Sequence, residues 1–248
     1  MTGSTRTAAA SGTLHVFATP AELIEGAAKW VVEHIEASED RYALALSGGS
    51  TPKPLYERLA QPDLARRIDW QRVHLFWGDE RFVPHDHPDS NYRMAKLALI
   101  DHVPIPAANV HPVPADGTPE SAAQRYAQTL RDFYGAGKLD VNRPLFDLNL
   151  LGIGDDGHTA SLFPGAPQLL EEKEWAVAVV GQKPEPRITL TYPVLDSADT
   201  VLFLAQGAAK RDPVARARHL DPKTPAGLVA PRGDLLWFLD KAAAPAQL

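Results

Sequence analysis

The sequence contains no cysteine, so it cannot form disulfide bonds, thiolate metal sites or a thiol nucleophile. It also has no surplus of positive charge, because 25 basic residues stand against 31 acidic ones and leave a net charge of -6. Without a positive field over the whole molecule, neither a nucleic acid nor an anionic membrane is expected as a partner. An anionic small molecule would therefore need a local basic site.

Long apolar runs are absent as well. The apolar segments are strand-sized, and residues 1–12 are polar and alanine-rich, without the apolar stretch that a secretion signal requires. This pattern predicts a cytoplasmic protein with a loose N-terminal tail over residues 1–12. A hydrophobic content of 44% is that of an ordinary globular protein. The 248 residues lie within the size that one α/β domain can reach, so one domain over residues 13–248 is expected.

Short apolar segments alternate with amphipathic stretches of helical length along the whole chain. The expected strands cover residues 14–18, 42–46, 73–77, 146–151, 175–180, 200–205 and 235–239. The expected helices cover residues 20–37, 54–60, 91–100, 119–133 and 207–218. Such alternation predicts the α/β class, with a mostly parallel, Rossmann-like sheet. Ligands of open α/β sheets bind beyond the carboxyl ends of the strands, where this sequence has three polar clusters.

The first cluster joins the strand at 42–46 to a helix, and its residues are Ser47, Gly48, Gly49, Ser50 and Thr51. Glycines let a ligand approach the backbone, and free N–H groups at the start of a helix bind anions. The segment has neither the dinucleotide-binding pattern nor the lysine of a P-loop, which favours a monophosphate over a nucleotide. A tight turn with an ordinary hydroxyl N-cap is the structural alternative.

The second cluster follows the strand at 146–151 and contains Asp155, Asp156 and His158. An imidazole titrates near neutral pH and a neighbouring carboxylate can fix its tautomer, so this arrangement suits proton transfer. The local sequence equally allows a capping aspartate beside a surface histidine, and either aspartate could orient the ring.

The third cluster contains Asp79 and Arg81, with Asn91 ten residues further on. An arginine can bind a phosphate, a carboxylate or a developing oxyanion with two N–H groups, although mixed charges of this kind often form surface ion pairs. Arg187 and Lys210 are further cations that could neutralise a phosphate at the glycine turn.

A metal site receives little support from the sequence. His85 and His87 lie on a polar segment, but no ligand spacing typical of a catalytic metal is present. A nucleophilic serine at Ser161 is also disfavoured, because the G-x-S-x-G pattern is missing.

Taken together, the clusters resemble the 6-phosphogluconolactonases, the short cytosolic type related to the glucosamine-6-phosphate deaminases. The matching segments occur in the family's order and span nearly the whole chain after the tail: Leu-Ser-Gly-Gly-Ser-Thr-Pro at 46–52, Trp-Gly-Asp-Glu-Arg at 77–81, Asp-Ser-Asn-Tyr at 89–92, Asp-Gly-His-Thr-Ala-Ser-Leu-Phe-Pro-Gly at 156–165, Arg-Ile-Thr-Leu-Thr at 187–191, and Gly207 with Lys210.

The resemblance implies a three-layer α/β/α fold and hydrolysis of 6-phospho-D-glucono-1,5-lactone, the second step of the oxidative pentose phosphate pathway, without metal or organic cofactor. It implies that His158 is the general base and that residues 47–51, Arg187 and Lys210 hold the phosphate. Asp79 and Arg81 match polar active-site residues of less settled role. The aspartate at 155 departs from the family, which usually has another residue there.

Two other functions stay open at this stage. The related deaminases carry an acid five residues after the histidine, where this chain has Phe163. A catalytically silent sugar-phosphate sensor would keep the anion site but lose the base, whereas His158, Asp156 and Arg81 are all present. The sequence does not decide between a monomer and a homodimer, nor whether Arg81 contacts phosphate or oxyanion.

Overall fold

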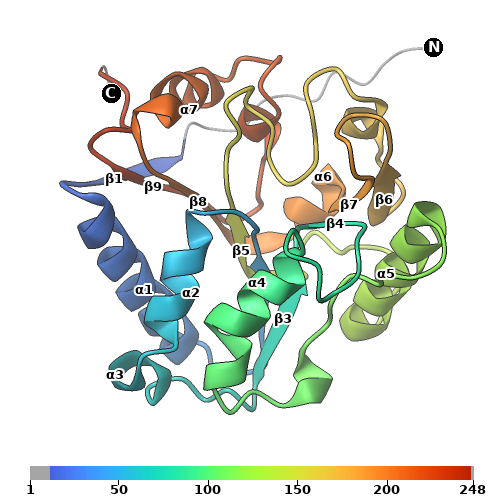
Figure 1. Ribbon diagram of the computed structural model, residues 1–248, viewed down its shortest axis with the longest axis horizontal. Coiled ribbons are helices and arrows are strands. Elements are labelled where there is room, and N and C mark those ends of the chain that lie inside the picture. Colours follow the sequence, from blue (N-terminus) through green and yellow to red (C-terminus); the bar gives the residue numbers. More distant parts are fainter. Residues whose placement is uncertain (1–11, 247–248) are drawn as a thin grey trace.

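Six parallel strands form the main sheet of the computed structural model, which describes residues 12–246. The sheet has the order β1-β9-β8-β5-β2-β3 and is shown in Figure 1. Its strands are β1 (Thr13–Phe17), β2 (Tyr42–Leu46), β3 (Val73–Trp77), β5 (Phe146–Leu151), β8 (Ala198–Ala205) and β9 (Asp234–Asp240). The predicted α/β fold with a mostly parallel sheet is confirmed. Of the predicted tail, only Gly12 lies within the described residues.

A second, three-stranded antiparallel sheet was not predicted. It contains β4 (Asp79–Arg81), β7 (Arg187–Leu190) and β6 (Ala176–Val179), in the order β4-β7-β6. Gly78 joins the two sheets, because its N–H donates to the carbonyl of Leu46 in β2 and its carbonyl accepts from Leu190 in β7, each at 2.9 Å. The chain thus passes from the main sheet to the small one immediately before Asp79.

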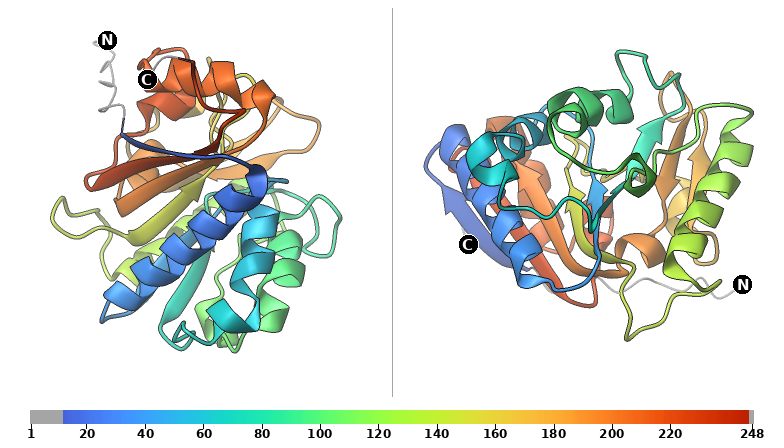
Figure 2. Two further views of the ribbon diagram at one scale, coloured as in Figure 1. Left: turned by 90° about the vertical axis from the view of Figure 1, so that its left-hand side faces the viewer. Right: turned by 90° about the horizontal axis from the view of Figure 1, so that it is seen from below.

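Helices cover both sides of the main sheet. They are α1 (Pro20–Ala37), α2 (Pro52–Leu59), α3 (Pro62–Ala65), α4 (Asn91–Ala98), α5 (Pro119–Tyr134), α6 (Tyr192–Leu195) and α7 (Arg211–Arg218), with short 3-10 turns η1 (Ile100–His102), η2 (Ala107–Asn109), η3 (Pro167–Leu170), η4 (Ala208–Lys210) and η5 (Pro225–Leu228). Helices α1, α2 and α4 lie on one side and α7 on the other (Figure 2), while α5 packs against the small sheet.

One continuous hydrophobic core includes buried side chains from five of the six strands of the main sheet and from the helices, and β1 packs against it through the partly buried Leu14 and Phe17. Strand β2 is buried along its whole length, as expected for a central parallel strand. The order of the sheet reverses beside it, because the chain moves from β2 outward to β3 and later returns to the other side of β2 with β5. This is the kind of switch point at which α/β sheets open a ligand crevice.

The predicted helix bounds needed corrections. The helix expected at 54–60 begins two residues earlier, at Pro52, and ends at Leu59. The helix expected at 91–100 ends at Ala98 and continues as the turn η1, because Leu99 leaves the helical conformation. The helix expected at 207–218 is divided into η4 and α7, since Gly207 has a φ of 90° and Pro213 lies in the first turn of α7.

Candidate active site

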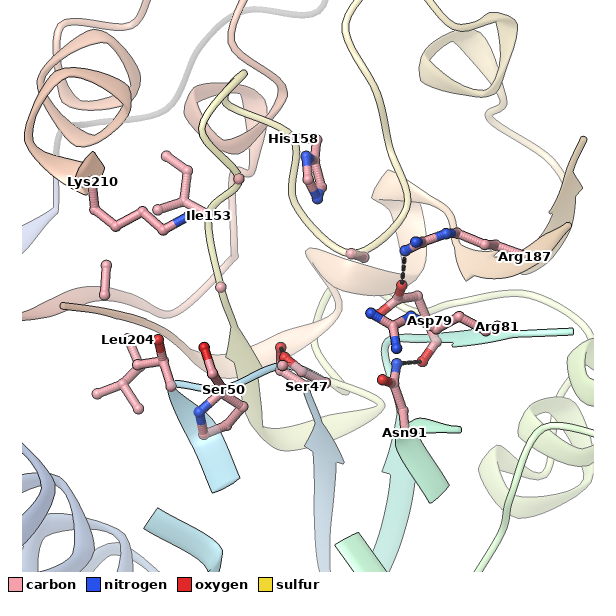
Figure 3. A pocket seen from close by; sticks show the side chains of 18 residues that line it. Ser47, Ser50, Asp79, Arg81, Asn91, Ile153, His158, Arg187, Leu204 and Lys210 are labelled. Atoms are coloured by element: carbon pink, nitrogen blue, oxygen red, sulfur yellow. Dashed lines mark hydrogen bonds and ion pairs between the residues drawn. The ribbon is translucent and has the colours of Figure 1, made fainter. Parts of the chain in front are cut away.

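A cavity opens at the carboxyl ends of β2, β5 and β8, where the sheet order reverses (Figure 3). It brings together residues that are far apart in the sequence. Eleven of the twelve residues predicted for the site line it: Ser47, Gly48, Gly49, Ser50, Thr51, Asp79, Arg81, Asn91, His158, Arg187 and Lys210. The twelfth, Asp156, contacts the cavity only through His158.

The glycine turn at 47–51 is held from behind by a tyrosine. The buried hydroxyl of Tyr56 accepts a hydrogen bond from the N–H of Ser47 at 2.9 Å and donates one to the Ser47 carbonyl at 2.8 Å. Gly49 has a φ of 106°, a conformation that side chains rarely adopt, and this lets the chain turn sharply toward α2.

The alternative of an ordinary hydroxyl cap does not hold for this turn. Thr51 precedes α2, but its side chain makes no capping hydrogen bond and its own backbone is already helical. Pro52 and Pro54 have no N–H, so the donors at this end of α2 come mostly from the turn itself. The turn lines the cavity, and its backbone N–H groups are therefore the candidate donors for an anion at this helix start.

Asn91 connects this turn to β4. Its amide nitrogen donates to the Asp79 carbonyl at 2.9 Å, and its side chain lies where a Cβ on Gly48 would be. Gly48 thus has to be glycine because of a close neighbour rather than because of its backbone angles.

Glu80 holds Asn91 in place, and sequence reasoning missed it. The Glu80 side chain is buried, and its carboxylate accepts hydrogen bonds from three backbone N–H groups and from the Ser90 hydroxyl. Two of those N–H groups belong to Asn91 and Tyr92, in the first turn of α4. Burial raises the pKa of Glu80, while the backbone hydrogen bonds oppose the rise. The hydrogen bonds from these donors, at the start of a helix, compensate for the energetic cost of removing the carboxylate from water.

The small sheet places two arginines opposite each other. Arg81 in β4 pairs with Arg187 in β7, and both line the cavity. The Arg187 guanidinium lies 3.9 Å from Oδ2 of Asp79, and burial lowers the pKa of Arg187. The Nε of each arginine is buried without a hydrogen-bond acceptor among residues 12–246. Both arginines therefore keep unused donor capacity close to the cavity.

Ser161 is a further residue that sequence reasoning did not place in the site. Its buried hydroxyl donates to Oδ2 of Asp79 at 2.6 Å, and its N–H donates to the hydroxyl of Thr189 at 3.2 Å. Thr189 is the β7 residue directly opposite Asp79. Ser161 thus fixes the segment that follows His158 against both strands.

His158 and Asp156 form a hydrogen-bonded pair. Oδ1 of Asp156 lies 2.5 Å from Nδ1 of the imidazole and 3.0 Å from the His158 backbone nitrogen. Burial alone would raise the pKa of Asp156, but these hydrogen bonds and the nearby Lys183 outweigh it and lower the pKa. An ionised Asp156 assigns the proton of a neutral ring to Nδ1 and leaves Nε2 as a proton acceptor.

The surroundings of His158 keep the ring in place. A Cβ on Gly154 would lie 2.1 Å from Nδ1 of His158, so only glycine allows the ring to pack there. On another side, the ring of Phe163 lies 4.7 Å from the imidazole, measured between ring centres. The imidazole points into the cavity above Ser47 (Figure 3).

Lys210 enters the cavity from the side opposite Arg187, with His158 between them (Figure 3). Its ammonium group contacts Oδ1 of Asp155 at 2.6 Å. The two neighbouring aspartates therefore have different partners: Asp156 contacts His158, and Asp155 contacts Lys210.

No cluster of three or more histidine, aspartate and glutamate side chains suited to a metal ion occurs within residues 12–246. His85 and His87 do not form a site together: the His85 ring contacts the Val113 carbonyl, and His87 contacts Asp89.

No helix within residues 12–246 has the length and apolar composition needed to cross a bilayer.

The fold and the site define an α/β protein with a cationic cavity and a histidine–carboxylate pair beyond its parallel strands. The chain belongs to the family described as glucosamine-6-phosphate isomerases/6-phosphogluconolactonase, whose model matches residues 18–237.

Individual relatives agree with this assignment. A 6-phosphogluconolactonase from Synechocystis is 46% identical over 213 residues, which is 84% of this chain and 85% of the relative. The 6-phosphogluconolactonase of Rattus norvegicus is 40% identical and covers 96% of this chain and 94% of its own. The solved structure of 6-phosphogluconolactonase from Trypanosoma cruzi superposes with a TM-score of 0.81 at 32% identity, over 96% of this chain and 97% of that one.

Proposed function

We propose that this protein hydrolyses 6-phospho-D-glucono-1,5-lactone to 6-phospho-D-gluconate, without a metal ion, in the oxidative pentose phosphate pathway. The names of the relatives support the reaction. The observation that carries the mechanism is the Asp156–His158 pair, which faces a cavity lined by the glycine turn and by three cationic side chains. The cytoplasmic location and the monomeric or homodimeric state remain predictions from the sequence.

In this proposal the backbone N–H groups of residues 48–51, together with Arg187 and Lys210, bind the 6-phosphate. The phosphate is remote from the reacting carbonyl, so its binding energy serves to place C1 of the lactone beside His158. Asp79 and Asn91 also line the cavity and offer polar atoms to the sugar hydroxyls.

His158 then acts as the general base. As a water oxygen bonds to C1, Nε2 takes one proton from that water, and Asp156 stabilises the imidazolium that forms. The carbonyl oxygen becomes an oxyanion, for which Arg81 and nearby backbone N–H groups are the candidate donors. When the bond between C1 and the ring oxygen breaks, Nε2 returns the proton to that oxygen, so one imidazole serves both steps.

A deaminase is the second candidate, since the family model includes both activities. A specific contact argues against it in this chain. The position of the deaminases' acid is taken by Phe163, which is buried and packs against the His158 ring. A phenyl ring cannot transfer a proton, so ring opening by an acid at this position is not available.

The test presents the purified protein with fresh 6-phosphoglucono-δ-lactone, corrected for spontaneous hydrolysis, and in parallel with glucosamine 6-phosphate while ammonia is followed. Fast loss of the lactone without ammonia is expected. Release of ammonia would identify a deaminase, and binding of 6-phosphogluconate with neither reaction would identify a sensor.

A further inference from the structure

Lys210 is already engaged by a carboxylate of this chain. The ammonium group of Lys210 and Oδ1 of Asp155 are 2.6 Å apart, and Lys210 is one of the cavity-lining residues. Asp155 belongs to the loop between β5 and His158, whereas Lys210 ends the turn η4, just before α7. The pair therefore connects the histidine loop to the opposite wall of the cavity.

The loop is also held by a contact that does not involve the carboxylate of Asp155. Arg216 in α7 donates through Nη2 to the backbone carbonyl of Asp155 at 3.3 Å, and this contact does not involve the side chain. The Asp155 side chain is 76% exposed, and Lys210 is the one hydrogen-bond donor that its carboxylate has within residues 12–246. Lys210 is therefore the cation that this carboxylate binds directly.

We propose that the Asp155 carboxylate competes with the substrate phosphate for Lys210 and so sets the affinity and the charge preference of the phosphate site. This inference rests on the proposed function, in which Lys210 binds the phosphate. A dianionic phosphate that reaches Lys210 displaces the carboxylate, because two anions at one ammonium repel each other. A ligand without a phosphate does not need Lys210 and is unaffected.

The size of the effect follows from the exposure of the pair. Ion pairs between exposed side chains are weak, so removal of the competing charge is expected to improve phosphate affinity by about two- to fivefold. Salt screens exposed charges over about 10 Å at 0.1 M ionic strength, so this gain should shrink as ionic strength rises.

The experiment compares Asp155→Asn with the control Asp212→Asn. Asp212 is equally exposed and lies in the first turn of α7, two residues after Lys210, but it pairs with Arg216. Both variants lose one negative charge near the cavity, and only the first frees Lys210. We expect Asp155→Asn to lower KM for the phosphorylated lactone and the Kd for inorganic phosphate, with no change in kcat/KM for unphosphorylated gluconolactone, and Asp212→Asn to change none of these.

An increased KM in Asp155→Asn would show instead that the carboxylate positions Lys210, and an unchanged KM would show an inert surface pair. An equal decrease in both variants would show only a long-range charge effect. Each of these results overturns the proposal. The wild-type protein tests the proposed function separately. If the wild type hydrolyses the lactone, the proposed function stands, whichever result the two variants give.

Discussion

The side chain of Asn91 occupies the space that a Cβ on Gly48 would need, because such a Cβ would lie 1.9 Å from Oδ1 of Asn91. Asn91 is buried and its amide is bound to the Asp79 carbonyl, so it cannot move away without losing a hydrogen bond. Gly48→Ala is therefore expected to destabilise the fold by about 1–3 kcal/mol, as overpacking does, and to raise KM by displacing the turn.

Denaturant unfolding and steady-state kinetics measure both effects. The control is Gly137→Ala, because Gly137 has no atom within 4 Å of its added Cβ and no positive φ. A Gly48→Ala protein as stable and active as this control would show that the turn tolerates a side chain.

Removal of the general base should reduce kcat more than it weakens substrate binding. His158→Ala is expected to lower kcat by about 10²- to 10⁴-fold, with a smaller change in KM. Asp156→Asn should lower kcat less, because Nε2 remains in the cavity while the negative charge that stabilises the imidazolium is lost. Near-normal kcat in His158→Ala would remove His158 from the mechanism.

The cations of the phosphate site should affect specificity. Arg187→Ala or Lys210→Ala is expected to raise KM for the phosphorylated lactone by about tenfold or more, because a charge-assisted hydrogen bond contributes about 1.5–3 kcal/mol. Rates with unphosphorylated gluconolactone should change little. The ratio of kcat/KM for the two lactones is the quantity to measure, and an unchanged ratio in both variants would refute the phosphate assignment.

Chelation should not affect the proposed reaction. Treatment with EDTA followed by gel filtration is expected to leave lactone hydrolysis at its initial rate, since a histidine base needs no metal-bound water. If activity is lost and a single divalent ion restores it, a metal mechanism through residues such as His85 or His87 has to be considered.

A pair of histidines far from the cavity should make stability depend on pH. His111 stacks on Phe76 with ring centres 4.5 Å apart and lies 3.2 Å from His74, measured between ring nitrogens. Burial, followed by the charge of His74, lowers the pKa of His111 to about 4. The folded state therefore favours the neutral ring.

The unfolded protein takes up this proton at a higher pH than the folded one, so the contribution to stability is complete above pH 6.5 and decreases as pH falls toward 4. His111→Phe keeps an aromatic ring against Phe76 and should flatten the pH dependence of the free energy of unfolding over this range, whereas His219→Gln, at an exposed position, should not. Equal slopes in the two variants would contradict the prediction.

The elements that could be predicted from sequence are those with simple local signals. Strands β2, β3 and β5 and helix α1 have the expected bounds. Each strand is a short, mostly apolar segment, with alternating Asp147 and Asn149 in β5, and ends at polar or glycine residues. Helix α1 begins where the Thr19 hydroxyl accepts from the Glu22 N–H, with Pro20 as the first helical residue. Because polar clusters follow parallel strands, their meeting at one edge of the sheet was also predictable.

The small sheet could not be predicted in the same way. Strand β4 has three residues, all charged, and β7 has four, so neither shows a readable alternation of apolar and polar positions. Their pairing is what sets Arg81 against Arg187 and brings Ser161 to Asp79. The choice between Asp155 and Asp156 as the partner of His158 likewise depends on the local path of the loop, which spacing alone does not determine.

The tyrosine behind the glycine turn has a counterpart on the neighbouring strand. Tyr126 binds both the N–H and the carbonyl of Trp77, as Tyr56 does for Ser47, and burial raises the pKa of both phenols. In each case the backbone at the strand end is secured by a phenol that does not line the cavity. Gly48, Asp79 and Asn91 are fixed by their own contacts, but cavity residues outside that set, such as Ser50, can be exchanged without loss of this backbone frame. Such positions are therefore the place to redesign substrate preference.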